Sequence, residues 1–284
     1  MKIIITIIIF ALTALTVAVS AQDFQGVATY KTQRKIEIKM DSTKVNDAMQ
    51  SQMMEMMKKQ FQKTYNLTFD KSSSIYQQEE ELSKPQVGGG DLIVSFGGGG
   101  GSDIFYKNVQ THNYIDQKET MGKKFLIKDS ISNIEWQLQS ETKHIGDYLC
   151  FKATYIKQVP KINLNFNSNS NQEEEEENEK EPEMEERTVT AWYTPQIPVS
   201  NGPAKYQGLP GLILEIHDGK LTIICSKIVI NPEDKIEIEA PTKGKEVSQK
   251  EYDEIMEKKA KEMMERYAPR KGSKDSGIVI SVGG

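Results

Sequence analysis

The stretch KYQGLPGLILEIHDGK, residues 205–220, holds two turns of different chemistry on either side of an apolar run. Pro210 fixes φ near the value that position i+1 of a type II turn needs, and Gly211 supplies the positive φ of position i+2. Asp218-Gly219 suits the type I′ turn of a β-hairpin. The stretch therefore predicts a rigid turn that directs the chain into a strand, followed by a hairpin.

The segment before this stretch is stiffened by proline. WYTPQIPVSNGPAKY contains Pro195, Pro198 and Pro203, which favour an extended path that is poor in ladder hydrogen bonds. Ordered loops of this length often carry function, but a structural crossover between sheet layers uses the same residues. Both interpretations stay open, and the loop is the surface on which we expect a partner.

The rest of the chain follows a period of two, with β-branched and aromatic residues in short runs between turn signals. The runs lie near residues 24–39, 64–70, 73–80, 104–109, 112–118, 123–128, 134–141, 148–157, 188–194, 212–217 and 220–230. Asp70-Lys71 and Gly146-Asp147 are further expected hairpin tips. Because most connections are too short for crossover helices, we predict a mainly β fold. We expect a single antiparallel β-sandwich or half-open barrel with a helical excursion and a C-terminal helix.

Two segments carry a helical period. Residues 42–62 place Met and other apolar side chains on one stripe, which predicts the helical excursion. Residues 248–267 begin with Ser248 and Glu251, the pattern of a capping box, and continue with an apolar stripe that starts at Tyr252. We expect both helices to lie against the sheet.

Three low-complexity segments are expected as loops or tails: a Gly-rich loop at 88–101, an acidic insert at 163–186 and a flexible tail at 271–284. The acidic insert contains ten Glu and one Lys, whereas the whole chain carries a net charge of −5. The acidity is therefore local and typical of a solvated disordered loop. The charge distribution gives no argument for nucleic-acid binding.

The first 21 residues read as a secretory signal peptide, with one Lys, an apolar run and small residues before the cleavage site. Residues 22–270 would then form one β domain, exported and with no transmembrane span. Cys150 and Cys225 each lie in an apolar strand-like run. They could form one disulfide or pack as two buried thiols, and the sequence leaves both alternatives open.

Few residues suggest chemistry, and no catalytic, cofactor or metal motif is present. Glu215 and His217 would share one face of a strand and could offer two metal ligands or an acid and base pair. Cys150 and His144 are a weaker nucleophile and base, because a hairpin turn separates them. We expect such pairs to be solvated or structural, and we expect no cofactor.

Met49, Met53 and Met57 are spaced one helical turn apart and could bind copper(I) through their thioethers. No Cys or His interleaves this run. Because Met also fills gaps beneath a helix, core packing is the preferred interpretation.

The sequence closely resembles the GLPGLI family of bacterial envelope proteins. The resemblance rests on the string Gly208, Leu209, Pro210, Gly211, Leu212 and Ile213, and it extends to TYNLTFDKSSSIYQQEEEL, MGKKFLIKDS, KHIGDYLCFKATY and VTAWYTPQIPVSNGPAKYQGLPGLILEI. It implies a secreted, periplasmic or outer-membrane-associated protein without an established activity or agreed catalytic residues. It also implies, by association, a link to TonB-dependent outer-membrane transport.

Three functions are compatible with these features. We expect a non-enzymatic binding or accessory protein of the periplasm or outer membrane, with an envelope protein as its partner. The first alternative is a periplasmic carrier of an apolar ligand such as lipid or lipopeptide, held by a curved sheet. The second is a hydrolase that uses Glu215, His217 or Cys150.

Overall fold

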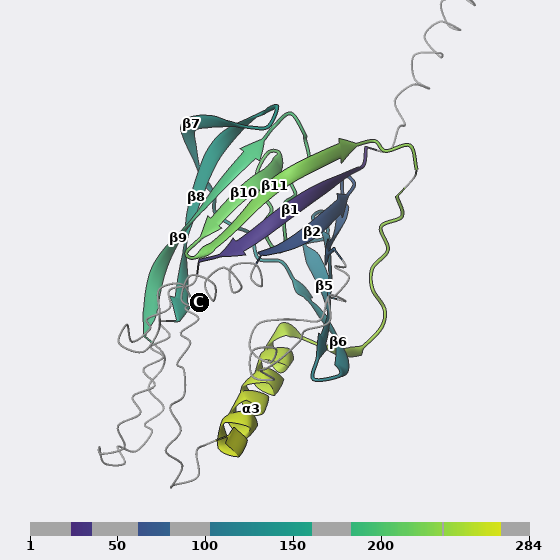
Figure 1. Ribbon diagram of the computed structural model, residues 1–284, viewed down its shortest axis with the longest axis vertical. Helices are drawn as coiled ribbons and strands as arrows, with labels where there is room; N and C mark the ends of the chain where they lie inside the picture. The colour runs from purple at the N-terminus through teal and green to yellow at the C-terminus, as the bar shows by residue number, and fades with distance from the viewer. Residues whose placement is uncertain (1–23, 36–61, 80–102, 161–182, 235, 268–284) are drawn as a thin grey trace, which may run out of the picture.

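The computed structural model describes residues 24–35, 62–79, 103–160, 183–234 and 236–267. These residues form one sheet of twelve strands, in the order β12-β6-β5-β4-β3-β2-β1-β11-β10-β9-β8-β7, and one C-terminal helix (Figure 1). β12 and β7 stand at its two ends, so the sheet is open. The predicted mainly β class is confirmed.

The elements have the following bounds: β1 Gly26–Arg34, β2 Gln62–Phe69, β3 Ser73–Gln78, β4 Ile104–Asn108, β5 Asn113–Thr120, β6 Lys123–Ser130, β7 Gln137–Ile145, β8 Tyr148–Pro160, β9 Met184–Thr194, β10 Leu212–Asp218, β11 Leu221–Ile230, β12 Lys245–Val247 and α3 Gln249–Tyr267.

The sheet consists of two antiparallel meanders that meet at the first strand. β1 to β6 follow one another in space, as do β7 to β11, and β1 pairs with both β2 and β11. β12 is the exception, because it runs parallel to β6. Figure 1 shows the two meanders bending away from each other below β1, so the sheet is strongly curved.

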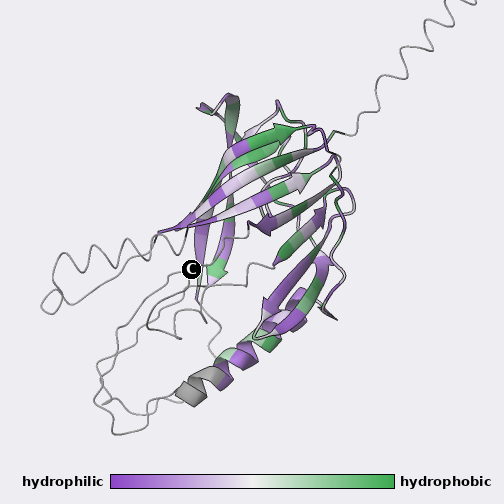
Figure 2. Ribbon diagram, turned by 45° about the vertical axis from the view of Figure 1, so that its right-hand side comes forward, coloured by the Kyte–Doolittle hydropathy of each residue, from purple (hydrophilic) through white to green (hydrophobic). Residues whose placement is uncertain are grey.

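Apolar and aromatic side chains fill the inner side of this curve, and Figure 2 shows the apolar segments along the central strands. Tyr30, Leu67, Phe69 and Ile216 are fully buried. Each such side chain contributes about 1.5–3 kcal/mol relative to an exposed one. The Tyr30 hydroxyl donates a hydrogen bond of 2.6 Å to the carbonyl oxygen of Ile213, which satisfies its polar group inside the core.

The expected hairpin tips occur, with one change of register. Asp70 accepts hydrogen bonds from the backbone of the next residues and closes the β2–β3 turn. Gly146, at φ +56°, begins the two-residue β7–β8 loop. The third tip is shifted, because Asp218 pairs with Leu221 and the loop is Gly219-Lys220. Only Gly219 has a positive φ, which corresponds to a type II′ turn, so the predicted type I′ turn is wrong.

Several boundaries differ from the predicted ones. β7 begins at Gln137 rather than near residue 134, because a tight turn from Ile134 to Trp136 takes the chain out of the ladder. β9 begins at Met184, so the end of the predicted acidic insert is a strand. Gln62, the expected end of the helical excursion, already belongs to β2.

Other predicted segments lie outside the described residues. They are the signal peptide 1–21, the helical excursion up to residue 61, the Gly-rich loop 88–101, the acidic insert up to residue 182 and the tail 271–284.

The C-terminal helix is confirmed, and so is its capping box. The backbone N–H of Ser248 donates to Glu251 Oε2 at 2.7 Å, and the N–H of Glu251 donates to Ser248 Oγ at 3.2 Å. Tyr252 packs edge-on against Phe125 of β6 at 5.4 Å between ring centroids. Ala260, further along the predicted apolar stripe, is exposed. The first turns therefore contact the sheet, and Figure 1 shows the helix continuing away from it.

Candidate functional site

The proline-rich loop, residues 195–211, lies across the inner side of the sheet and ties the two meanders together. Alternate side chains are buried, among them Ile197, Val199 and Leu209. The backbone N–H groups of Leu212 and Ile213, at the start of β10, donate to carbonyl oxygens within the loop. The loop is thus a structural crossover whose remaining side chains face solvent.

Lys107 of β4 fixes the middle of the loop. This lysine is fully buried, and its Nζ donates to the carbonyl oxygens of Gly202 at 2.6 Å, Ala204 at 2.7 Å and Tyr206 at 3.0 Å. An ammonium group has three N–H donors, so each of them has an acceptor. Burial lowers the pKa of Lys107 well below its ordinary value. The three bonds hold the backbone on both sides of Lys205.

The GLPGL turn differs from the predicted type II turn. The N–H of Gly211 donates to the carbonyl of Leu209 at 2.8 Å, which closes a γ-turn over Pro210. The N–H of Leu212 donates to Ile197 instead, so the bond that would close a type II turn is not formed. The prediction failed because the loop competes for this donor, and the loop follows from tertiary packing.

Gly211 is required by a close approach of two backbone segments. Its φ is +158°, and a Cβ atom at this position would lie 2.2 Å from the carbonyl oxygen of Thr194 and 2.8 Å from the nitrogen of Pro195. Real Cβ contacts are not shorter than 3.0 Å. The glycine lets the two ends of the loop pass each other.

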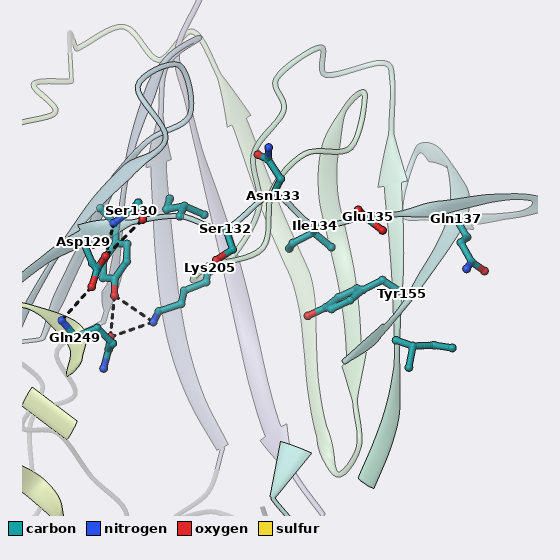
Figure 3. Close-up of a pocket in the computed structure, with 13 residues that line it drawn as sticks. Asp129, Ser130, Ser132, Asn133, Ile134, Glu135, Gln137, Tyr155, Lys205 and Gln249 are labelled. Atoms are coloured by element: carbon teal, nitrogen blue, oxygen red, sulfur yellow. Dashed lines mark hydrogen bonds between the residues drawn. The ribbon is translucent and has the colours of Figure 1, made fainter. Parts of the chain in front are cut away.

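Lys205 extends from the loop toward β5 and the start of α3. Its Nζ lies 3.2 Å from Gln249 Oε1, 3.5 Å from Tyr114 Oη and 4.7 Å from the centroid of the tyrosine ring. Tyr114 Oη donates to the same Gln249 oxygen at 2.8 Å. Figure 3 shows this triangle of polar atoms. Partial burial lowers the pKa of Lys205 and raises the pKa of Tyr114 to about 12.

Asp129 links this polar group to the sheet. Its carboxylate accepts hydrogen bonds from the N–H of Ser130 at 2.7 Å and of Gln249 at 3.1 Å. These bonds lower the pKa of Asp129. The carboxylate thereby anchors the first residue of α3 to the end of β6.

The opposite wall is aromatic. Trp136 meets Tyr155 of β8 edge-on, with 4.8 Å between ring centroids and an interplanar angle of 81°. The Trp136 indole donates to the carbonyl of Gln207 at 2.8 Å, which holds the tryptophan to the loop. In Figure 3, Lys205 lies between Tyr155 on one side and Asp129 on the other.

A cleft of about 800 Å³ lies between the two meanders, with Lys205, Tyr155 and Asp129 in its lining and Trp136 packed against Tyr155 outside the lining. Its walls come from β5, β6, the first residue of β7, β8, the first residue of α3, Lys205 of the loop and the connector at residues 131–135. Hydroxyls, amides, tyrosine rings and isoleucines line it together with the charged Asp129, Glu135 and Lys205. The loop that the sequence indicated is present here through Lys205, but Lys107, Trp136 and Tyr155 carried no signal in the sequence.

Tyr206, which follows Lys205 in the loop, is held to β10. Its hydroxyl donates to Asp218 Oδ2 at 2.7 Å, and Lys157 Nζ contacts the same oxygen. Burial raises the pKa of Tyr206, and the bond to Asp218 adds to this shift.

The predicted pair of Glu215 and His217 is adjacent on one face, at a distance from the cleft lining. Glu215 Oε1 lies 2.5 Å from His217 Nε2 and 2.7 Å from Lys143 Nζ. His217 Nδ1 lies 3.3 Å from the hydroxyl of Thr222. Both imidazole nitrogens are thus engaged, and Lys143 stands 4.4 Å from the ring centroid of Trp192. The geometry is that of a cross-strand ion pair network.

The cysteines do not form a nucleophilic site. Cys150 lies directly opposite Lys143 in the β7–β8 ladder, so its neighbour His144 points to the other face. Burial raises the pKa of the Cys150 thiol to about 11 and that of Cys225 to about 12, opposite to what an activated thiolate needs. Both cysteines are buried free thiols, and the alternative disulfide is not formed in the structure.

In the described part of the chain, no three His, Cys, Asp or Glu side chains group so as to hold a metal ion. Met49, Met53 and Met57 lie outside it. No helix of the described part is long and apolar enough to cross a membrane.

Comparison with known proteins gives a family of unknown function. Residues 136–215 match the model of a family described as "Protein of unknown function (Porph_ging)". No curated protein matches the chain. Two solved chains of PNGF-II, in space groups P21 and C2, are similar with 12% and 14% identity and TM-scores of 0.46 and 0.44. The similarity covers 82% and 83% of this chain, which spans about a third of each solved chain (33%). The matched segment contains the proline-rich loop and the cleft-lining residues Gln137, Tyr155, Ile156 and Lys205.

Proposed function

We propose that this protein is an exported, non-enzymatic binding protein of the bacterial envelope, and that the cleft between the two meanders is its binding site. The observation that carries the proposal is the cleft of about 800 Å³, into which Lys205, Gln249 and Tyr155 converge from separate parts of the chain. Binding sites are typically concave, of this size, and lined by apolar groups with a few placed polar ones. Such sites also use loops positioned by a rigid scaffold.

The filled inner face favours this function over the carriage of an apolar ligand. A carrier would leave the inside of the curved sheet for its cargo. Here Ile197, Val199 and Leu209 of the loop are buried with the sheet residues. Because the loop is fixed by Lys107, it does not readily move aside for a lipid.

The contacts and pKa values of the three candidate catalytic side chains favour binding over hydrolysis. Glu215 is shared by Lys143 and His217, and the thiol of Cys150 has a raised pKa. None of these residues lines the cleft.

The test is photo-crosslinking in cells of the organism that makes the protein. A benzophenone amino acid replaces Asn133, which is exposed and lines the cleft, and a control replaces Val229, which is 37% exposed on β11. The proposal expects one envelope protein to be captured from position 133 and not from position 229. TonB-dependent transporters are the first partners to look for, since the resemblance to the GLPGLI family suggests them. The same set of neighbours from both positions would contradict the proposal.

A further inference from the structure

Within the part of the chain that the structure describes, half of strand β8 has a neighbour on only one side. β8 pairs with β9 from Phe151 to Pro160, but β7 covers β8 only as far as the pair Gln137 and Thr154. Among the described residues, nothing pairs with the other side of residues 155–160. This leaves backbone N–H and C=O groups of a regular strand open at the edge.

The open edge borders the cleft. Tyr155, Ile156 and Gln137 all line it. A chain that continued the line of β7 backwards from Gln137 would pair with residues 155–160. Instead, residues 131–136 leave that line, because Trp136 is held by the carbonyl of Gln207 and the N–H of Trp136 turns back to Ile134. The space beside the start of the edge, at Tyr155 and Ile156, is therefore the cleft.

The two terminal strands of the sheet, β12 and β7, are protected. β12 has three residues, and the side chain of Glu246 pairs with Lys128. β7 is interrupted by a bulge between Leu138 and Thr142 and carries charged side chains. Short strands, bulges and charges are the devices by which natural sheets prevent unwanted pairing.

The edge at residues 155–160 lacks these devices over most of its length. Ile156 is 56% exposed, and the one charged side chain, Lys157, is neutralised by Asp218. Proline, which cannot donate, stands only at the end, as Pro160. The unpaired backbone N–H and C=O groups of an edge can form hydrogen bonds with another extended chain. Because this edge has no net charge, it favours an extended chain that is uncharged and rich in β-branched residues.

We propose that residues 155–160 of β8 accept an extended segment of the partner as an added strand, so that recognition in the cleft is by main-chain pairing. The segment has an uncharged core of β-branched residues, whose side chains alternate between the face of the strand that carries Tyr155 and the face that carries Ile156. This inference rests on the proposed function and names the kind of partner segment that the site takes.

The test uses a peptide probe and two matched variants of the mature chain. The probe is Ac-Lys-Thr-Val-Thr-Val-Thr-Lys-NH2, and its control has the five internal amides N-methylated, which keeps the side chains and removes the donors. The variants are Ile156→Lys, which places a charge on the open edge, and Val229→Lys, which makes the same change on an exposed position of β11. Amide hydrogen exchange of residues 155–160 and the Kd of each peptide are measured.

The inference expects the probe to slow exchange at alternate amides of residues 155–160. Methylation should weaken binding by about tenfold or more, since two or three backbone bonds are lost. Ile156→Lys should also weaken binding by about tenfold, because it places an unpaired charge on the open edge. Val229→Lys should leave binding unchanged.

Four other outcomes overturn the inference. Unchanged exchange in this segment, together with a specific crosslink at position 133, rejects strand addition and leaves the proposed function standing. Equal binding of both peptides also rejects it, because side chains would then suffice. Protection that grows with protein concentration without probe would assign the edge to a second copy of this chain. Absence of both protection and the crosslink would reject strand addition and the proposed function together.

Discussion

The replacement of Gly211 by alanine should destabilise the fold through one steric contact. The new Cβ would lie 2.2 Å from the carbonyl oxygen of Thr194, whereas ordinary van der Waals contact begins at 3.4 Å. The two backbone segments must separate by about 1 Å, and overpacking of this kind costs about 1–3 kcal/mol. The φ of +158° adds about 1–3 kcal/mol, because L residues avoid it. We expect a total loss of about 2–6 kcal/mol in the free energy of unfolding.

The matched control is Gly146→Ala. Gly146 also has a positive φ, +56°, but nothing lies within 4 Å of the added Cβ, so only the backbone cost of about 1–2 kcal/mol applies. Urea unfolding followed by circular dichroism compares the two variants with the wild type. For a domain of this size the difference corresponds to roughly 5–10 °C in Tm. Equal losses in the two variants would refute the close approach of residues 194 and 211.

Three further predictions follow from buried or capping groups. Lys107→Met should cost about 2–4 kcal/mol, since three carbonyls lose their donor. The pKa of Lys107 is lowered in the folded state, so above that pKa the unfolded state binds more protons than the folded state. The stability of the wild type relative to Lys107→Met should therefore rise as the pH increases toward 10.5. A stability difference that does not change with pH would contradict the burial of this ammonium group. The thiols of Cys150 and Cys225, with pKa values of about 11 and 12, should react with a disulfide reagent at pH 8 only after unfolding, and rapid labelling of the native chain would refute their burial. Ser248→Ala should lower the free energy of unfolding by about 1 kcal/mol and speed amide exchange in the first turn of α3. The control Glu257→Ala, in an exposed i,i+4 ion pair, should change the stability by less than about 0.5 kcal/mol. Equal losses of stability in the two variants would contradict the cap.

The strands were predictable because their signal is local. Alternating side chains and short turns place β2 to β6 and β8 to β11 within a few residues of their expected positions. β12 was missed, because its three residues pair with β6 about 120 positions earlier in the chain. Gly244, beside it, would set a Cβ 2.8 Å from the backbone of Phe125, a contact that only the pairing creates.

The turns show the limit of local reasoning. Proline and glycine correctly indicated a rigid turn at residues 210 and 211. They did not indicate its type, because the hydrogen bond that would close a type II turn goes to Ile197 instead. Gly219 likewise supplies the positive φ, but the pairing of Asp218 with Leu221 sets the register.

The sequence predicted only part of the candidate site. The sequence indicated the proline-rich loop; its crossover interpretation agrees with the structure, whereas its role as a binding surface stays a prediction. Lys107 gave no signal, because a lysine inside a β pattern is ordinarily solvated. It is buried because the three carbonyls of the loop face it, and those carbonyls come from residues nearly 100 positions away.

The sequence by itself determined the β class, the hairpins, the capped C-terminal helix and the stiffness of the loop, since each depends on φ preferences and side-chain periodicity over a few residues. Tertiary structure alone decided that β1 joins two meanders, that the loop fills the inside of the curved sheet, and that β8 extends beyond the end of β7 beside a cleft. These features depend on contacts between distant segments, and such contacts are set by the packing of the whole sheet.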